Sequence, residues 1–443
     1  MAQGGSIDSA RTHSTGAGIV TGAPFQSGED FAIAMDARDP LAHFRNRFCL
    51  PKTKGGEDCI YLCGHSLGLQ PKLASSYIEQ ELRDWAQLGV EGHFHAKSPW
   101  VPYHRLLTDQ TAALVGALPS EVVVMNSLTV NLHLMMASFY RPTKQRHKIL
   151  VERGAFPSDQ YAVKSQINFH GFAPTSSLVE LTPREGKSCL RDEDVESLID
   201  REGNSIALIM LGGVNYFTGQ VFDMAGITKA GHAKGCVVGF DLAHAAGNIP
   251  LRLHDWGPDF AVWCNYKYLN GGPGCVGGCF VHERHARAWD VPRLTGWWGH
   301  DEKTRFEMGP DFRPMVGAEG WQLSNPPILA LAPLRASLEI FDEAGMDRLR
   351  AKSMTLTGYM EFLLAERGSP KFSVITPPEP AHRGAQLSIQ LPHNGRDLCA
   401  RLIEQGVIGD WREPDTFRVA PVPLSNSYRD VYRFVQHFLS ALR

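Results

Sequence analysis

The chain has 443 residues, of which 43% are hydrophobic and 21% are charged, and its formal net charge is −3. This composition is typical of a globular protein with a large core, and the length predicts about two or three domains. The small net charge gives no reason to expect nucleic acid or an anionic membrane as a partner, and no apolar run approaches the roughly 20 residues of a membrane helix.

The N-terminal part is predicted to begin with a tail. Residues 1–28 form this tail, because the first 24 are rich in Gly, Ser, Thr and Ala and lack the apolar core of a secretory signal. A helix is then expected over 36–48 and a short strand over 60–62. An amphipathic helix over 72–88 carries Ile78, Leu82 and Trp85 on one face.

Strand-like and helix-like segments then alternate up to about residue 282. Apolar runs bounded by loop residues predict strands over 148–152, 206–212, 236–242, 260–263 and 276–282. Helices are predicted over 107–116, 129–139 and 192–201. This alternation predicts an α/β fold in which a mostly parallel sheet is covered by helices on both faces.

A second region with an α+β pattern begins near Pro326. A helical stretch over 328–364, broken near Gly345, precedes strands over 372–375, 386–391 and 416–420 and helices over 396–405 and 428–442. We therefore expect a flexible tail over 1–28, an N-terminal arm over 29–70 that packs on the small domain, a large domain over 71–325 and a smaller C-terminal domain over 326–443.

Lys267 is the most informative residue of the chain. It follows an apolar run, and Asp241 ends an earlier one. A buried amine and a buried carboxylate are each costly without a charged partner. Pyridoxal 5′-phosphate (PLP) supplies both partners, an aldehyde for the amine and a pyridine nitrogen for the carboxylate. For these two residues alone, a mutual ion pair or two charges at the surface are equally good explanations.

Neighbouring segments suit the rest of such a cofactor. Residues 126–131 open a predicted helix with small polar residues, whose N–H groups and hydroxyls suit a phosphate, although simple helix capping explains them as well. Phe156 follows a strand and is suited either to stacking on a pyridine ring or to core packing. His244 is a candidate for supporting Asp241 or the phosphate, and Tyr266 for binding the phosphate or donating a proton.

Six segments, which keep their order along the chain, together resemble the kynureninase family. They are GHSLGLQP (64–71), LTVNLH (128–133), FPSD (156–159), GFDLAH (239–244), NYKYLN (265–270) and RVAPVPL (418–424). The likeness runs from about residue 30 to the C-terminus. It implies a fold-type I, PLP-dependent hydrolase of carbon–carbon bonds. Such enzymes cleave the Cβ–Cγ bond of L-kynurenine or 3-hydroxy-L-kynurenine to an anthranilate and L-alanine, in tryptophan catabolism and NAD biosynthesis.

The resemblance also implies a role for each matching residue. Lys267 bonds to the cofactor, Asp241 pairs with its pyridine nitrogen, and Phe156 stacks on its ring, while Tyr266 reaches the phosphate and takes part in catalysis. The other expected cofactor residues are Leu128, Thr129, Asp159, His244, Trp297 and Asn325. The expected substrate residues are Ser66, His93, Asn325 and Arg418. Arg418 grips the α-carboxylate, for which a guanidinium is well shaped, and Trp297 and Asn325 complete the site across the interface of a homodimer.

Two positions depart from the family pattern. Gly212 stands where a hydroxyl residue is expected, which puts one side-chain contact to the cofactor in doubt. Trp298 replaces a smaller aromatic residue and is expected to reshape the pocket for the aryl group.

The cysteines do not suggest a metal site or a disulfide framework. The pairs Cys59/Cys63 and Cys275/Cys279 have C-x3-C spacing within apolar segments, so we expect buried structural cysteines and no metal. Nine cysteines, an odd number, fit a reducing cytoplasm best.

Other functions fit the sequence less well. A cysteine desulfurase or an aminotransferase shares the expected fold, but in a desulfurase the lysine typically follows a histidine, whereas Tyr266 precedes Lys267 here. A PLP-fold protein without activity has no need to keep Lys267, Asp241 and Arg418 together. A nicotinamide-dependent dehydrogenase is disfavoured because residues 271–274 contain a proline and do not open a helix.

Overall fold

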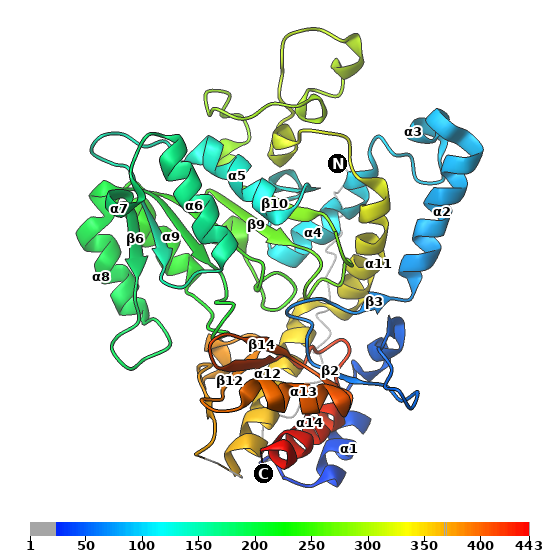
Figure 1. Ribbon diagram of the computed structural model, residues 1–443. Helices are drawn as coiled ribbons and strands as arrows, with labels where there is room; N and C mark the ends of the chain where they lie inside the picture. The colour runs from blue at the N-terminus through cyan, green and yellow to red at the C-terminus, as the bar shows by residue number, and fades with distance from the viewer. Residues whose placement is uncertain (1–23, 367, 369, 443) are drawn as a thin grey trace, which may run out of the picture.

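A seven-stranded sheet forms the centre of the larger body of the molecule (Figure 1). The computed structural model describes residues 24–366, 368 and 370–442. The strand order is β4-β10-β9-β8-β7-β5-β6, with parallel neighbours from β9 to β6 and with β10 antiparallel to both β9 and β4. The strands are β4 (Val122–Met125), β5 (Lys148–Glu152), β6 (Leu178–Leu181), β7 (Ile206–Gly212), β8 (Val237–Asp241), β9 (Phe260–Cys264) and β10 (Gly277–Val281).

Helices pack on both faces of this sheet, as the alternation of side chains along β5 shows. Ile149 and Val151 lie in one apolar cluster with residues of α5 and α6, whereas Leu150 lies in another with residues of α8 and α9. The helices of this body are α4 (Thr108–Val115), α5 (Leu128–Phe139), α6 (Pro157–Phe169), α7 (Pro174–Ser177), α8 (Asp192–Glu202), α9 (Met224–Ala233), α10 (Leu253–Trp256) and α11 (Ile328–Ala344). The predicted mostly parallel sheet, covered on both faces, is confirmed.

A second body is built on a smaller antiparallel sheet in the order β11-β12-β15-β14. Its elements are β11 (Ser373–Val374), β12 (Leu387–Gln390), β13 (Val407–Ile408), β14 (Asp410–Arg412), β15 (Thr416–Val419), α12 (Met346–Glu366), α13 (Gly395–Glu404) and α14 (Tyr428–Ala441). Its apolar core also includes Ala32 of α1 (Glu29–Ala37). Among the helices that the structure describes, none is long and apolar enough to cross a membrane.

The N-terminal segments join the two bodies through short strands. β2 (Ile60–Tyr61) pairs with β13, and β1 (Phe48–Cys49) pairs with β3 (Gln70–Pro71). The single helix predicted over 36–48 is wrong: α1 ends at Ala37, and a 3-10 helix over Ala42–Arg47 follows. Pro40 explains the break, because the residue before a proline disfavours helical backbone. Most of the predicted tail, residues 1–23, lies outside the described residues.

The long helical stretch does break at Gly345, whose φ of 76° favours glycine. α11 ends at Ala344, and α12 begins at Met346. α11 packs against α2 and α4 of the large body. The predicted boundary at 325/326 assigns this helix to the small domain, whereas these contacts place it with the large body. The domain bounds stay a prediction.

α2 (Leu73–Leu88) turns its apolar face outward. Leu82 is 42% exposed and Trp85 is 61% exposed, although both are large apolar residues. The buried positions of this helix include Glu81, whose carboxylate accepts hydrogen bonds from Trp100 Nε1 and from the Tyr103 hydroxyl. The predicted helix is confirmed, and its outward apolar face is a feature typical of a surface that a partner covers.

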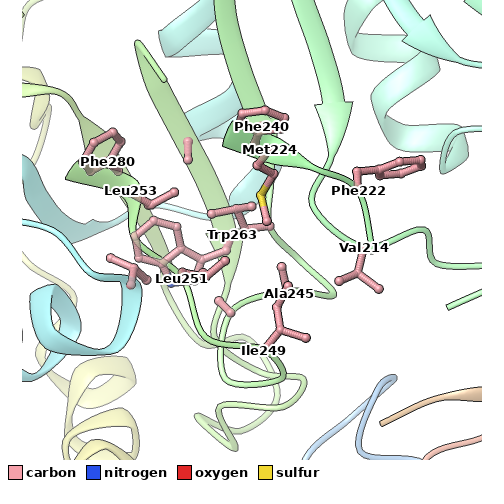
Figure 2. Packing of buried hydrophobic residues seen from close by; sticks show 14 of the residues in the cluster. Val214, Phe222, Met224, Phe240, Ala245, Ile249, Leu251, Leu253, Trp263 and Phe280 are labelled. Atoms are coloured by element: carbon pink, nitrogen blue, oxygen red, sulfur yellow. The ribbon is translucent and has the colours of Figure 1, made fainter. Parts of the chain in front are cut away.

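Bulky side chains fill the core beneath β8, β9 and β10 (Figure 2). Trp263 of β9 pairs in register with Gly278 of β10, and a Cβ at Gly278 would lie 2.1 Å from the Trp263 ring. Gly239 of β8 is paired with Phe260 in the same way. These glycines leave room for an aromatic ring on the neighbouring strand, so the core fixes the position of β9 and of the loop that follows it.

Candidate active site

A pocket opens where three parallel strands of the large sheet end. Glu152 of β5, Gly212 of β7 and Asp241 of β8 each close their strand and line this pocket. Ligands of open α/β sheets bind at this edge. The pocket brings together eight residues predicted from the sequence: Leu128, Thr129, Phe156, Asp159, Asp241, His244, Tyr266 and Lys267. Five further residues that line it have no predicted role: Glu152, Ser158, Val214, Tyr216 and Ala243.

The loop that carries Lys267 is held by hydrogen bonds to its flanks. Asn265, which follows β9, accepts a hydrogen bond from Trp263 Nε1 at 2.9 Å and donates one to the carbonyl of Val276 at 2.9 Å. The N–H of Gly68 donates to the carbonyl of Tyr266. A Cβ at Gly68 would lie 2.3 Å from the carbonyl oxygen of Lys267, so only glycine fits there. The GHSLG segment thus braces the lysine loop.

The amine of Lys267 lies inside the pocket. Its Nζ is 3.3 Å from Nε2 of His244 and 5.8 Å from the ring centroids of both Phe156 and Tyr266. The nearest partner of the amine is therefore His244. Lys267 and Asp241, both described by the structure, do not form the direct ion pair that the sequence left open. Burial, followed by the charge of Lys267, lowers the pKa of His244 well below its ordinary value, so this imidazole is neutral.

Three carboxyl groups line the pocket together with the amine. Burial raises the pKa values of Asp241, Asp159 and Glu152, that of Glu152 to about 7. The charge of Lys267 opposes the shift at Asp241 and at Asp159. Asp159 Oδ1 and Glu152 Oε2 are buried and accept no hydrogen bond from the described residues. The pocket thus has more acid than base, which suits a ligand that carries a cationic group.

Two helices begin at the wall of the pocket. α5 starts at Leu128 and α6 at Pro157, and neither N-cap residue uses its side chain to cap the helix. The hydroxyls of Thr129 and Ser158 are 2.9 Å apart, one in the first turn of each helix. Unsatisfied N–H groups and the helix dipole make such a position favourable for an anion, and the two hydroxyls add further donors.

Arg418 lies beside the pocket and is 1% exposed. Its Nε and Nη2 donate to the two carboxylate oxygens of Asp410 at 2.8 and 2.6 Å, and its Nη1 donates to the carbonyl of Tyr216 at 2.6 Å. The guanidinium carbon is 5.9 Å from the centroid of the Tyr216 ring, which lines the pocket. Arg418 is therefore a cation held directly behind one wall of the site.

Curated relatives match almost the whole chain. The kynureninase of Koribacter versatilis is 67% identical over 420 residues, which cover 95% of this chain and 99% of the relative. The kynureninases of Myxococcus xanthus and Stenotrophomonas maltophilia are 61% and 55% identical, over 93% and 91% of this chain and 97% and 96% of the relatives. The family model for the kynureninase C-terminal domain matches residues 349–438.

The chain belongs to the kynureninase family. Membership confirms the predicted resemblance, the assignment as a carbon–carbon bond hydrolase and the dependence on PLP, and it favours these over a desulfurase or an aminotransferase.

Solved structures add the fold. The cysteine desulfurase of Escherichia coli superposes with a TM-score of 0.72 at 20% identity, over 91% of this chain and 98% of the other. That of Thermococcus onnurineus gives 0.69 at 17% identity, over 85% and 93%. At such identities the likeness concerns the fold alone, and it confirms the predicted fold-type I architecture.

The residues of this kynureninase-family pocket fit PLP. The buried, unpartnered oxygens of Asp159 and Glu152 and the carboxylate of Asp241 suit a protonated pyridine nitrogen, and the two helix starts suit a phosphate. Phe156 is 40% exposed at the rim, where an aromatic ring is free to cover another. Lys267 supplies the amine. The cofactor roles of the individual residues stay predictions.

Besides Arg418, four predicted residues do not line this pocket of the single chain. Trp297 borders a separate hollow formed by residues 295–312, and Asn325 is exposed. His93 is half-buried, with its ring 5.4 Å from that of Trp100, and Ser66 lies two residues before the Gly68 brace. The roles of these four residues, and the second subunit that they imply, stay predictions.

The two departures from the family pattern have different surroundings. A Cβ at Gly212 would meet its nearest neighbours, Glu152 Oε1 and the carbonyl of Val214, at 3.5 Å, so space alone does not require glycine there. Trp298 is 1% exposed and lies under the guanidinium of Arg305, 4.4 Å from its carbon. This tryptophan packs inside its own loop and does not line the pocket.

His65 gives a prediction for stability at acidic pH. This residue is fully buried, and burial, followed by the charge of Arg418, lowers its pKa to about 4 from an ordinary 6.5. Between about pH 6.5 and 4 the unfolded chain binds a proton at position 65 that the folded chain does not, so stability is lost as the pH falls through this window. In urea titrations, wild type is expected to lose up to about 3 kcal/mol more than His65→Asn between pH 7 and 4.

The exposed His43 provides the control for this experiment. His43→Asn is expected to follow the wild-type profile. Equal acid-dependent losses of stability in wild type and in His65→Asn would contradict a neutral, buried His65.

Proposed function

We propose that this chain hydrolyses the Cβ–Cγ bond of L-kynurenine or 3-hydroxy-L-kynurenine to anthranilate or 3-hydroxyanthranilate and L-alanine. The observation that carries the proposal is the amine of Lys267 inside an acid-lined pocket at the carboxyl edge of the sheet, in a member of the kynureninase family. When bound, PLP supplies an electron sink that stabilises negative charge on the carbon atoms next to the substrate amine.

Lys267 is assigned two roles. Its Nζ tethers the cofactor and, once the substrate amine has taken its place, removes the α-proton of the substrate. The neutral His244, 3.3 Å from Nζ, adds no second positive charge beside this amine. The carboxylate of Asp241 holds the proton on the pyridine nitrogen, and its hydrogen bond from the N–H of Ala243 at 2.7 Å fixes its orientation.

Tyr266 is assigned as a proton donor. Burial raises the pKa of its hydroxyl, so the phenol keeps its proton at neutral pH. Water adds to the γ-carbonyl carbon of the substrate, the Cβ–Cγ bond breaks, and Cβ takes up a proton from the phenol as the anthranilate leaves. Tyr266 lines the pocket beside Lys267, which supports this role.

The two ends of the substrate are assigned to different residues. Arg418 binds the α-carboxylate, and Ser66, His93 and Asn325 lie at the aromatic end. His93 and Asn325 favour 3-hydroxykynurenine, because an imidazole and an amide are both able to hydrogen-bond to the 3-hydroxyl group of this substrate. A higher kcat/KM for kynurenine than for its 3-hydroxy derivative would reject this preference.

We also propose that the enzyme is a cytoplasmic homodimer with shared active sites. The exposed apolar side chains of Leu82, Trp85 and Phe94 support an interface, because an uncovered apolar face on one side of a body is typical of a partner contact. Nine free cysteines support a reducing compartment. Light scattering of the purified enzyme measures the number of subunits.

Purified protein incubated with PLP and either kynurenine is expected to release a fluorescent anthranilate and one equivalent of alanine. Borohydride reduction followed by peptide mass spectrometry is expected to place the cofactor adduct on Lys267. Turnover that requires a 2-oxo acid, or an adduct on another lysine, would contradict the proposal.

A further inference from the structure

Asp410, at the start of β14, binds two guanidinium groups at once. Besides both bonds from Arg418, its Oδ2 accepts a hydrogen bond from Arg412 Nη2 at 2.9 Å. Burial alone would raise the pKa of this carboxyl, but His65 and Arg418 outweigh it and keep the pKa well below its ordinary value. The His65 Nε2 lies 3.7 Å from Asp410 Oδ1, beyond hydrogen-bond distance. No function assigned above uses Asp410.

The bonds from Arg418 leave one edge of its guanidinium free. A guanidinium has five N–H groups. Three of them donate, two to Asp410 and one to the carbonyl of Tyr216. The other two, one on each Nη, have no acceptor among the described residues, and a carboxylate that binds a guanidinium in a fork needs two donors.

The charges around Asp410 also favour the binding of one further anion. Two guanidinium groups face a single carboxylate, so the cluster has one positive charge in excess. The groups that face it from other elements are His65, Cys63, Tyr268 and Cys399. His65 is neutral at pH 7, and burial raises the pKa values of the two thiols and of the Tyr268 phenol, so these groups add no charge.

We propose that Asp410 is a positioning residue for the substrate: it holds the Nε–Nη2 edge of Arg418, so that the free edge presents two N–H groups to the α-carboxylate. The inference rests on the proposed role of Arg418. Asp410 acts through the guanidinium and does not touch the substrate. Its effect on binding is geometric and outweighs its charge, which by itself repels the carboxylate that the site must bind.

The sign of the change in KM separates geometry from charge. Asp410→Asn removes a negative charge beside the carboxylate site, so electrostatics alone would lower KM. The asparagine amide turns N–H groups toward one half of the Nε–Nη2 edge, so it no longer holds the guanidinium of Arg418 in place. We therefore expect KM to rise about tenfold, with kcat changed less than about threefold. Asp410→Glu keeps the charge but displaces the carboxylate, and it is expected to raise KM in the same direction.

A substrate analogue without the α-carboxylate tests whether Asp410 affects binding through the contact between Arg418 and this carboxylate. The decarboxylated amine of kynurenine, used as a competitive inhibitor, is expected to have the same inhibition constant with wild type and with both Asp410 variants. Glu413→Gln removes a negative charge from an exposed ion pair with Arg396 just beyond β14, and it is expected to leave all constants unchanged.

The outcomes are distinct. A lower or unchanged KM in both Asp410 variants overturns the inference, and so does an equal loss of affinity for the decarboxylated inhibitor, which would indicate general damage to the pocket. Absence of kynurenine hydrolysis in the wild type would instead overturn the proposed function. The PLP absorbance band of each variant shows whether the pocket is intact, and Asp410→Glu keeps the test open if Asp410→Asn does not fold.

Discussion

Replacing Lys267 with alanine is expected to lower kcat by about four orders of magnitude or more, with the fold retained. The side chain lines the pocket, where we propose that it provides both the tether and the base, and it is only half-buried. The loop backbone is held by Asn265 and by the contact with Gly68, not by the amine. Steady-state release of anthranilate measures the loss, and circular dichroism checks the fold.

The exposed Lys187 supplies the matched control. Lys187→Ala removes an amine of the same kind from a surface loop and is expected to keep wild-type kcat and KM. Near-normal turnover in Lys267→Ala would remove this residue from the mechanism, because turnover would then not depend on an amine at position 267.

The sequence predicts five of the seven strands of the large sheet, because each of these five is a short apolar run between loop residues. Both β5 and β7 have the predicted bounds. The strands and helices that escape prediction are short or have weaker patterns. β4 and β6 have four residues each, and α6 starts at a proline after a strand and is largely polar on its outer face. Their existence depends on tertiary contacts that a local pattern does not contain.

The candidate site follows from sequence where a functional residue sits next to a strand end or a helix start. Asp241, Phe156 and Lys267 are of this kind, because parallel strands end at one edge. The sequence does not indicate Tyr216 or Glu152 as site residues. Tyr216 is an aromatic residue in a loop without a motif, and a charged residue at the end of a strand, such as Glu152, is usually a surface residue. The outward apolar face of α2 also lies beyond sequence periodicity, since an amphipathic pattern does not say what its apolar side contacts.

Replacing Arg418 with lysine is expected to raise KM for kynurenine about 10- to 100-fold, with a smaller change in kcat. Lysine keeps the positive charge, but it presents a point charge in place of the forked pair of N–H groups. A hydrogen bond to a charged group contributes about 1.5–3 kcal/mol, which corresponds to this range of affinity. Initial rates over a range of substrate concentrations separate the two constants. Arg396→Lys, in an exposed ion pair with Glu413, is the matched control and is expected to leave both constants unchanged.

Arg418→Ala is expected to raise KM further, but it also removes one of the two cations that compensate Asp410. Breaking a buried ion pair costs about 3–5 kcal/mol of folding stability, so part of any activity loss in this variant reflects unfolding. Thermal melts of both variants separate the two effects. If KM stays at the wild-type value in the folded fraction of either variant, Arg418 does not bind the substrate carboxylate, because a buried guanidinium that served only to pair with Asp410 would alter stability without altering substrate affinity.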